Sequence, residues 1–311
     1  MKPVILCASR LMDHAIKRLE ADYDLRRLDQ AEDREAFLKE VGPSVRAIAT
    51  GGGADAALMD ACPNLEIISS FGVGYDNVDS EHAKSRGIAV CNTPDVLNDE
   101  VANTAIMLLL AVSRKLVAYD RYVREGRWVK EGNPPLTNGI AGKKVGIVGL
   151  GRIGKAIAEK LAVFHCEISY FGRNKQDDVS FPYFSDPVEL AKACDALIVI
   201  TPGGSATRHL ISADVIDALG PDGILVNVAR GTVVDEKAMV DALANGRLGG
   251  AGLDVFEEEP KVPEALFAMD HVVLQPHQGS ATVETRQAMA DRMVDNLVLW
   301  LDGKPPLSRA V

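Results

Sequence analysis

The sequence lacks an excess of positive charge. Its 311 residues include 34 Lys and Arg against 44 Asp and Glu, so the formal net charge is −10 at pH 7. A chain with this balance has no overall electrostatic attraction to the phosphates of nucleic acids. We therefore expect no nucleic-acid partner, and any anion that binds needs a local site.

Long hydrophobic runs are also absent. The longest uninterrupted apolar stretch spans only residues 105–112, whereas a membrane-spanning helix needs roughly 20 residues. The apolar residues 4–8 are too few for a secretory signal and are expected to form a buried strand instead. The sequence thus predicts a soluble protein with no membrane partner.

Cysteine pairs and metal-ligand spacings are missing as well. The five cysteines form no Cys-x-x-Cys motif, and their odd number is typical of a reducing compartment, so we expect a cytoplasmic protein. Histidines and cysteines show no metal-ligand spacing, and we predict no metal site. Because 47% of the residues are hydrophobic, the chain can bury a sizeable core and is not disordered.

Short apolar runs alternate with amphipathic stretches in the first part of the chain. The length favours two domains, at roughly 150 residues per domain. Within the first 97 residues we expect helices over residues 14–21, 35–41, 56–61 and 79–86 and strands over residues 4–7, 23–28, 47–49, 65–70 and 88–90. This alternation is typical of a parallel sheet covered by helices.

A second alternating series runs from residue 144 to about residue 273. Residues 99–125, which lack Pro and Gly, are predicted to form one long helix that bridges the two domains, and residues 283–301 the last helix. The strands are expected over residues 145–148, 167–171, 196–200, 224–228, 250–253 and 271–274. Their number suits a doubly wound, Rossmann-type sheet that binds a dinucleotide.

One glycine-rich turn lies where such a sheet binds phosphate. Gly149, Gly151 and Gly154 form a Gly-x-Gly-x-x-Gly motif between a predicted strand and the helical residues 155–164. The first glycine permits the turn, the second lets a pyrophosphate approach, and the third lets the helix pack on the strand. The helix N-terminus offers N–H groups to the phosphates. We count Arg152 and Ile153, inside the motif, among the cofactor contacts; the alternative is a glycine turn without a ligand.

The next strand ends without the carboxylate that usually binds the adenosine ribose. Arg173, Asn174 and Lys175 stand in its place. Arg173 can hold a 2′-phosphate by charge-assisted hydrogen bonds, and Lys175 adds a point charge. The sequence therefore predicts NADP(H) in preference to NAD(H), and the alternative is an exposed polar turn that accepts either cofactor.

Three polar residues are expected beyond the carboxyl ends of later strands, where open α/β sheets bind ligands. Arg230 presents a planar guanidinium that suits a carboxylate and an adjacent carbonyl oxygen. His277 can protonate that oxygen as a hydride reaches the carbon, and Glu259 can hydrogen-bond the imidazole, favour its charged form and fix its orientation. Each of the three, taken alone, is equally well read as an ordinary surface or loop residue.

Together these segments resemble a known family. Residues 149–154, 227–231, 252–260 and 276–282 look like the D-isomer-specific 2-hydroxyacid dehydrogenases, in order along nearly the whole chain. Within that family the chain looks closest to NADPH-dependent glyoxylate/hydroxypyruvate reductases and to plant hydroxyphenylpyruvate reductases. The segment from Thr93 to Ala102 supports this placement, although Asn98 and Asn103 depart from the Thr and Asp expected there.

The resemblance implies how the site is built. Arg230, Glu259 and His277 would be the catalytic set. The N–H groups of Val73 and Gly74 would bind the substrate carboxylate, with Arg230 and His277 as further substrate contacts. The remaining expected cofactor contacts are Thr201, Pro202, Thr207, Val228, Ala229, Gly279, Ser280 and Asp254, the last of which would face the nicotinamide.

The resemblance also implies a fold of the α/β class. A smaller, flavodoxin-like substrate domain would comprise residues 1–97 and 283–311, and a Rossmann-type dinucleotide-binding domain residues 98–282. NADPH would lie across the carboxyl ends of the second sheet, and a small 2-oxo acid would enter the cleft between the domains. Glyoxylate and hydroxypyruvate are the first expected substrates, and acids of the phenylpyruvate type come next.

Assembly and two competing functions stay open. Trp128 lies in a region that helps to form a homodimer in related reductases, and burial in the core of its own subunit is the alternative. One competing function is a dinucleotide-sensing regulator, against which the complete set of Arg230, Glu259 and His277 argues. The other is an NAD-linked 3-phosphoglycerate dehydrogenase, against which the cationic strand end at Arg173 argues.

Overall fold

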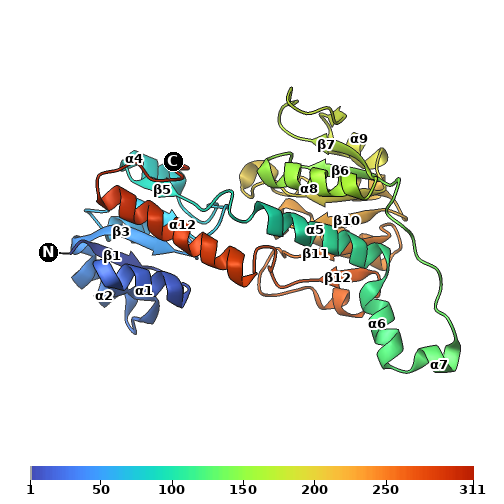
Figure 1. Ribbon diagram of the computed structural model, residues 1–311, viewed down its shortest axis with the longest axis horizontal. Helices are drawn as coiled ribbons and strands as arrows, with labels where there is room; N and C mark the ends of the chain where they lie inside the picture. The colour runs from blue at the N-terminus through green and yellow to red at the C-terminus, as the bar shows by residue number, and fades with distance from the viewer. Residues whose placement is uncertain (1) are drawn as a thin grey trace. The chain divides into compact units, whose positions relative to one another are not determined.

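The computed structural model describes residues 2–311 and divides into two compact units (Figure 1). Unit 1 comprises the chain up to Leu97 together with Ala281–Val311, and unit 2 comprises Asn98–Ser280. The second boundary thus follows residue 280, two residues before the boundary expected from the sequence. Both units are α/β layers built on a parallel sheet, which confirms the predicted fold class.

Unit 1 is built on a five-stranded parallel sheet in the order β2-β1-β3-β4-β5. This is the flavodoxin-like order expected from the resemblance. The strands are β1 (Val4–Cys7), β2 (Asp24–Arg27), β3 (Val45–Thr50), β4 (Ile67–Ser70) and β5 (Ala89–Cys91). The helices are α1 (Asp13–Asp22), α2 (Arg34–Val41), α3 (Ala56–Asp60), α4 (Ser80–Ser85) and α12 (Val283–Leu301).

Strands β1, β3, β4 and β5 of unit 1 are largely buried on both faces, as in most parallel sheets, whereas the edge strand β2 is only partly buried. Ile5 and Ile67 pack on one face with residues of α1 and α12. Their neighbours Leu6 and Ile68 point to the opposite face and pack with residues of α3 and α4. This two-sided burial explains why β1 and β5 are continuous apolar runs in the sequence.

Unit 2 holds a seven-stranded parallel sheet in the order β12-β11-β10-β9-β6-β7-β8. Its strands are β6 (Lys144–Val148), β7 (Glu167–Phe171), β8 (Tyr183–Phe184), β9 (Ala196–Val199), β10 (Ile224–Asn227), β11 (Gly250–Leu253) and β12 (Val272–Leu274). The chain leaves β6 toward β7 and later returns to its other side as β9, so the switch point lies between β6 and β9. The Rossmann-type arrangement is confirmed, and the short β8 was not predicted.

Helices cover this sheet closely (Figure 1). They include α5 (Asn98–Ser113), α8 (Arg152–Val163), α9 (Pro187–Lys192), α10 (Ala213–Leu219) and α11 (Glu236–Ala244). A Cβ atom at Gly252 of β11 would lie 2.9 Å from the Cβ of Leu108 in α5. The glycine therefore lets α5 lie directly on the strand.

The prediction of a single long helix over residues 99–125 is wrong. Helix α5 ends at Ser113, and α6 (Leu116–Arg124) continues at an angle of 59°. Lys115 between them has a left-handed φ of 50°, a conformation that ends the regular helix. No glycine or proline marks the break, so no residue of this segment signals it. No single helix within residues 2–311 is long and apolar enough to cross a membrane. Within the same range, α5 and α6 reach the required length and apolar composition only when the bent pair is counted together.

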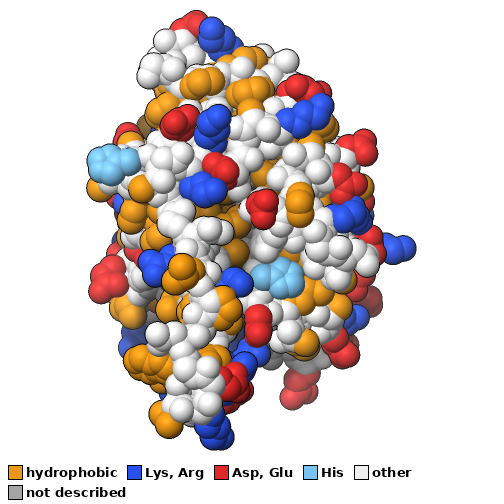
Figure 2. Space-filling view, turned by 90° about the vertical axis from the view of Figure 1, so that its right-hand side faces the viewer, with side chains coloured by type: hydrophobic (Ala, Val, Ile, Leu, Met, Phe, Trp, Pro, Cys, Tyr) orange, Lys and Arg blue, Asp and Glu red, His pale blue; other side chains and the backbone are white. Residues whose placement is uncertain are grey.

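Beyond the bend, residues 116–139 form an arm, which includes α6 and α7 (Arg127–Glu131) and projects from the rest of unit 2 (Figure 1). Trp128 in the arm is 56% exposed, and its indole N–H donates to Asn133 Oδ1 at 2.8 Å. Burial of Trp128 in the core of its own subunit is therefore excluded. Figure 2, which views the side on which the arm lies, shows hydrophobic side chains at the surface among charges of both signs.

Candidate active site

The glycine-rich turn connects β6 to α8 at the switch point of unit 2. Gly149 has a φ of 105°, and a Cβ atom there would lie 2.9 Å from the carbonyl oxygen of Ile200. At Gly154 a Cβ atom would lie 2.2 Å from the carbonyl oxygen of Gly149. Only glycine therefore fits at either position, because any side chain would push α8 away from the turn.

Gly151 differs from the other two glycines because the space that its Cβ atom would occupy is open. It is the N-cap of α8, and no side chain caps the first N–H groups of the helix. Next to the turn lies Thr201, whose Oγ1 is buried and has no hydrogen-bond partner within the described residues 2–311. Open space, uncapped N–H groups and an unpartnered hydroxyl fit the phosphates of a dinucleotide.

The predicted adenosine end follows β7. Arg173, Asn174 and Lys175 are all exposed, and neither cation forms an ion pair with another residue of the described range. Gln176 connects this segment to the phosphate turn, because its side chain donates to the carbonyl oxygen of Leu150 at 2.6 Å. Gln176 was not among the predicted site residues, since nothing in its local sequence pattern signals this contact.

The loop after β10 carries Arg230. The buried side chain of Asn227 accepts a hydrogen bond from Ala229 N at 3.0 Å and donates one to the carbonyl oxygen of Arg230 at 3.0 Å. The guanidinium of Arg230 also donates to the carbonyl oxygen of Ala229 at 2.7 Å. A Cβ atom at Gly231 would lie 1.9 Å from the backbone of Phe256, so the Arg230 loop lies against the loop that leads to Glu259.

Glu259 and His277 form a hydrogen-bonded pair. The distance from His277 Nδ1 to Glu259 Oε2 is 2.8 Å, and Glu259 Oε1 accepts a hydrogen bond from Phe256 N at 3.1 Å. Because Glu259 engages Nδ1, Nε2 is the ring nitrogen left to act on a ligand. The imidazole is 46% exposed, so a ligand from solvent can reach it.

Asp254 supports the loop that carries His277. Its side chain is buried, and its two oxygens accept hydrogen bonds from Gln278 N at 2.6 Å and Gly279 N at 2.8 Å. Burial raises the pKa of the Asp254 carboxyl, while these two N–H donors oppose the rise. The carbonyl oxygen of Asp254 also accepts a hydrogen bond from His277 N at 2.8 Å. Asp254 therefore holds in place the backbone segment that carries His277.

Residues 106–279 match the family model for the NAD-binding domain of D-isomer specific 2-hydroxyacid dehydrogenases. This match spans more than half of the chain and contains the phosphate turn and the Arg230, Glu259 and His277 loops. The chain belongs to this family.

Relatives of known name agree with the family model. Hydroxyphenylpyruvate reductase of Plectranthus scutellarioides is 53% identical over 277 residues, which is 88% of each chain. Glyoxylate/hydroxypyruvate reductase A of Arabidopsis thaliana is 47% identical and covers 99% of this chain and 98% of its own. The crystal structure of an NADPH-dependent glyoxylate/hydroxypyruvate reductase from Sinorhizobium meliloti, in complex with NADP and malonate, superposes with a TM-score of 0.95. The two chains are 46% identical over 100% of this one and 97% of that one.

A second set of contacts in this dehydrogenase supports the loop that leads to Glu259. The side chain of Glu236 accepts a hydrogen bond from Glu257 N at 3.0 Å, and burial raises the pKa of the Glu236 carboxyl. Glu257 in turn pairs with Arg208 at 2.6 Å and lies 3.2 Å from His209. Sequence reasoning missed Glu236 and Glu257, because their roles depend on contacts between separate loops.

The predicted site residues of the dehydrogenase do not all belong to one unit. Val73 and Gly74 lie in unit 1, in the loop after β4, whereas Arg230, Glu259, His277 and the predicted cofactor contacts lie in unit 2. Unit 2 brings the Arg230 and Glu259 loops into contact and pairs Glu259 with His277. The role of Val73 and Gly74 in substrate binding stays a prediction.

Proposed function

We propose that this protein reduces small 2-oxo acids to D-2-hydroxy acids with NADPH, and that glyoxylate and hydroxypyruvate are its substrates. The observation that carries the proposal is the 2.8 Å contact between His277 Nδ1 and Glu259 Oε2. A histidine held by a carboxylate, with its other nitrogen accessible, suits proton transfer to a carbonyl oxygen. The glyoxylate/hydroxypyruvate reductases among the relatives support this choice.

The residues of unit 2 fit the cofactor, and we assign this unit as the dinucleotide-binding domain. The turn at Gly149, Gly151 and Gly154, with Arg152 and Ile153, would hold the pyrophosphate, and Arg173, Asn174 and Lys175 the 2′-phosphate. Further contacts would come from Thr201, Pro202, Thr207, Val228, Ala229, Asp254, Gly279 and Ser280. When bound, NADPH supplies the hydride for the carbonyl carbon.

The chain's own residues would bind the substrate and move one proton. Arg230 and the N–H groups of Val73 and Gly74 hold the substrate carboxylate. His277 donates the proton on Nε2 to the carbonyl oxygen, which becomes the hydroxyl of the product. Glu259, through Nδ1, keeps the imidazole in the orientation that points Nε2 away from the carboxylate.

A second candidate is the reduction of hydroxyphenylpyruvate or phenylpyruvate. It is favoured by the 53% identity to a hydroxyphenylpyruvate reductase. The same acid, arginine and cofactor chemistry would serve both substrate classes, which differ only in the group attached to the keto carbon. A panel of 2-oxo acids therefore separates the two candidates.

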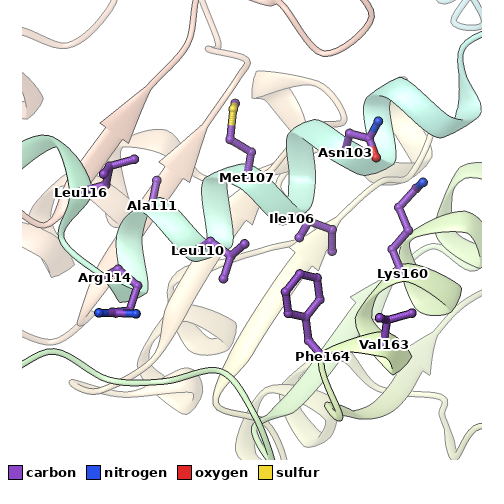
Figure 3. A pocket seen from close by; sticks show the side chains of 10 residues that line it. All are labelled: Asn103, Ile106, Met107, Leu110, Ala111, Arg114, Leu116, Lys160, Val163 and Phe164. Atoms are coloured by element: carbon purple, nitrogen blue, oxygen red, sulfur yellow. The ribbon is translucent and has the colours of Figure 1, made fainter.

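We also propose that the protein is a cytoplasmic homodimer that assembles through the arm. Val129 and Leu136 of the arm are 94% and 98% exposed. Beside the arm, a groove between α5 and α8 is lined by apolar side chains that include Ile106, Leu110 and Phe164 (Figure 3). Sedimentation should give twice the chain mass, and Leu136→Asp should give a monomer. The cytoplasmic location, which suits the five free thiols, is tested by cell fractionation.

Steady-state kinetics with both cofactors test the proposed reaction. We expect kcat/KM for glyoxylate or hydroxypyruvate to be at least about tenfold higher with NADPH than with NADH, because a 2′-phosphate gains charged hydrogen bonds. A protein that binds NADPH but turns over no 2-oxo acid would instead be a dinucleotide sensor. Preference for NADH and 3-phosphohydroxypyruvate would identify a 3-phosphoglycerate dehydrogenase.

A further inference from the structure

The loop after β4 in unit 1 presents two free backbone N–H groups. Neither Val73 N nor Gly74 N has a hydrogen-bond partner in the part of the chain that the structure describes. Two carbonyl groups of the same loop are engaged. Thr93 N donates to the carbonyl oxygen of Gly72 at 2.8 Å, and the side-chain amide of Asn92 donates to that of Val73 at 2.9 Å.

These two hydrogen bonds determine where the N–H groups point. The carbonyl of Gly72 and the N–H of Val73 belong to one peptide group, and the carbonyl of Val73 and the N–H of Gly74 belong to the next. Both peptides are trans, so each N–H points opposite to its carbonyl. Because both carbonyls are held toward Asn92 and Thr93, both N–H groups face the opposite side, where an anion can accept from the two together.

Residues near the C-terminus of the chain hold the backbone of Asn92 in place. Its carbonyl oxygen accepts hydrogen bonds from Ser308 Oγ at 2.6 Å and from the side-chain amide of Asn296 at 3.2 Å. Asn296 is fully buried in α12, and its Oδ1 accepts from Ser308 N at 3.1 Å. Around this cluster the C-terminal residues run along β5, where Cys91 and Arg309 form an antiparallel bridge.

We propose that Asn92, fixed by Asn296 and Ser308, is a positioning residue for the substrate carboxylate. It acts through the carbonyl of Val73, which it holds so that the N–H groups of Val73 and Gly74 stay convergent. The inference rests on the proposed function, because it takes the anion at these N–H groups to be the carboxylate of the 2-oxo acid. The C-terminal segment thereby becomes part of the substrate-binding apparatus.

The test is Asn92→Asp, which replaces the amide donor by an oxygen that repels the carbonyl of Val73. Carboxylate binding is equal in the ground and transition states, so its loss raises KM and leaves kcat nearly unchanged. We expect KM for glyoxylate to rise about tenfold, with kcat changed by less than about threefold. The Kd of NADPH, measured by fluorescence titration, should stay at the wild-type value.

Asn64→Asp is the matched control. Asn64 also donates its side-chain amide to a backbone carbonyl of unit 1, that of Pro43 at 2.7 Å, but it does not touch the Val73 loop. The same chemical change there should leave KM as it is. If Asn92→Asp does not fold, Ser308→Ala takes its place, with an expected KM increase of about threefold that Ser308→Thr reverses.

Two results overturn the inference. One is a folded Asn92→Asp protein with the wild-type KM. The other is a parallel loss of NADPH affinity, which would mean general damage rather than a misplaced carboxylate site. Wild-type turnover is measured first: if the wild type reduces no 2-oxo acid, the proposed function itself fails, whereas an active wild type with an unaffected variant refutes the role of Asn92 alone.

Discussion

Two glycine turns, one in each unit, present backbone N–H groups by different means. In unit 2, Gly151 caps α8, and the free N–H groups belong to the start of that helix. In unit 1, α4 begins only at Ser80, so the N–H groups of Val73 and Gly74 belong to no helix. Their direction comes from Asn92 and Thr93, which hold the carbonyls of the same peptides.

The difference shows what each turn depends on. A helix start prepares its N–H groups locally and adds the positive end of the helix dipole, which suits a doubly charged pyrophosphate. The Val73 turn has no helix dipole behind it and depends on residues far along the chain, from Asn92 to Ser308. It suits a ligand with a single negative charge, such as a carboxylate. We therefore expect changes at the two turns to affect different ligands.

The largest expected effect concerns the chemical step, because the proposed acid, His277, lies in unit 2, apart from the Val73 turn of unit 1. His277→Ala should lower kcat about 10²- to 10⁴-fold, the range for the loss of a general acid, without changing the Kd of NADPH. Steady-state kinetics with glyoxylate measure it. His271→Ala, a change at another histidine of unit 2, is the control. Retention of most activity would remove His277 from its assigned role.

Next in size is the cofactor preference. Arg173→Ala should weaken NADPH binding about 10- to 100-fold, because a charged hydrogen bond to the 2′-phosphate is lost. NADH binding should not change, since that cofactor has no 2′-phosphate. Titration of both cofactors against wild type and variant measures the ratio. Equal weakening for NADH would show that Arg173 acts on the fold and not on the phosphate.

A smaller effect is expected at Gly151. The space around its Cβ position is open, so Gly151→Ala should leave the free energy of unfolding unchanged and weaken NADPH binding about tenfold by filling the phosphate space. Gly154→Ala should lower stability as well, because its Cβ atom would meet the backbone of Gly149. Gly139→Ala, at another open position, is the neutral control. Unfolding of Gly151→Ala at lower denaturant would contradict the assignment.

The smallest effect is expected at Thr201. Its buried hydroxyl has no partner within residues 2–311, so Thr201→Val should raise the stability of the free protein by about 1 kcal/mol. If the hydroxyl pairs with the cofactor, NADPH affinity should fall a few-fold in the same variant. Thermal unfolding with and without NADPH measures both changes. A variant that gains stability equally in both conditions would remove Thr201 from the cofactor site.

Local sequence patterns revealed much of the fold and of the site. Most strands and the phosphate turn were predictable because the inner strands of a parallel sheet are largely apolar and the glycine spacing is local. Arg230, Glu259 and His277 were singled out by their place after strands and by resemblance. The break at Lys115 could not be predicted, since its left-handed conformation has no local residue signal.

The supporting contacts were hidden for another reason. Asn92 and Ser308, like Glu236 and Glu257, meet across long stretches of sequence, and each is an ordinary polar residue until the fold brings it to its partner. Buried polar groups find partners in folded proteins, but the sequence does not name the partner. The residues that do the chemistry were therefore easier to find than those that position them.

The most direct test of the account is to measure the Kd of NADPH and the KM of glyoxylate for Gly151→Ala and Asn92→Asp under one set of conditions. We expect a crossed result: Gly151→Ala weakens NADPH binding and spares the substrate, whereas Asn92→Asp raises KM for the substrate and spares NADPH. If both variants change both constants to the same extent, the two turns do not serve separate ligands, and the account is wrong.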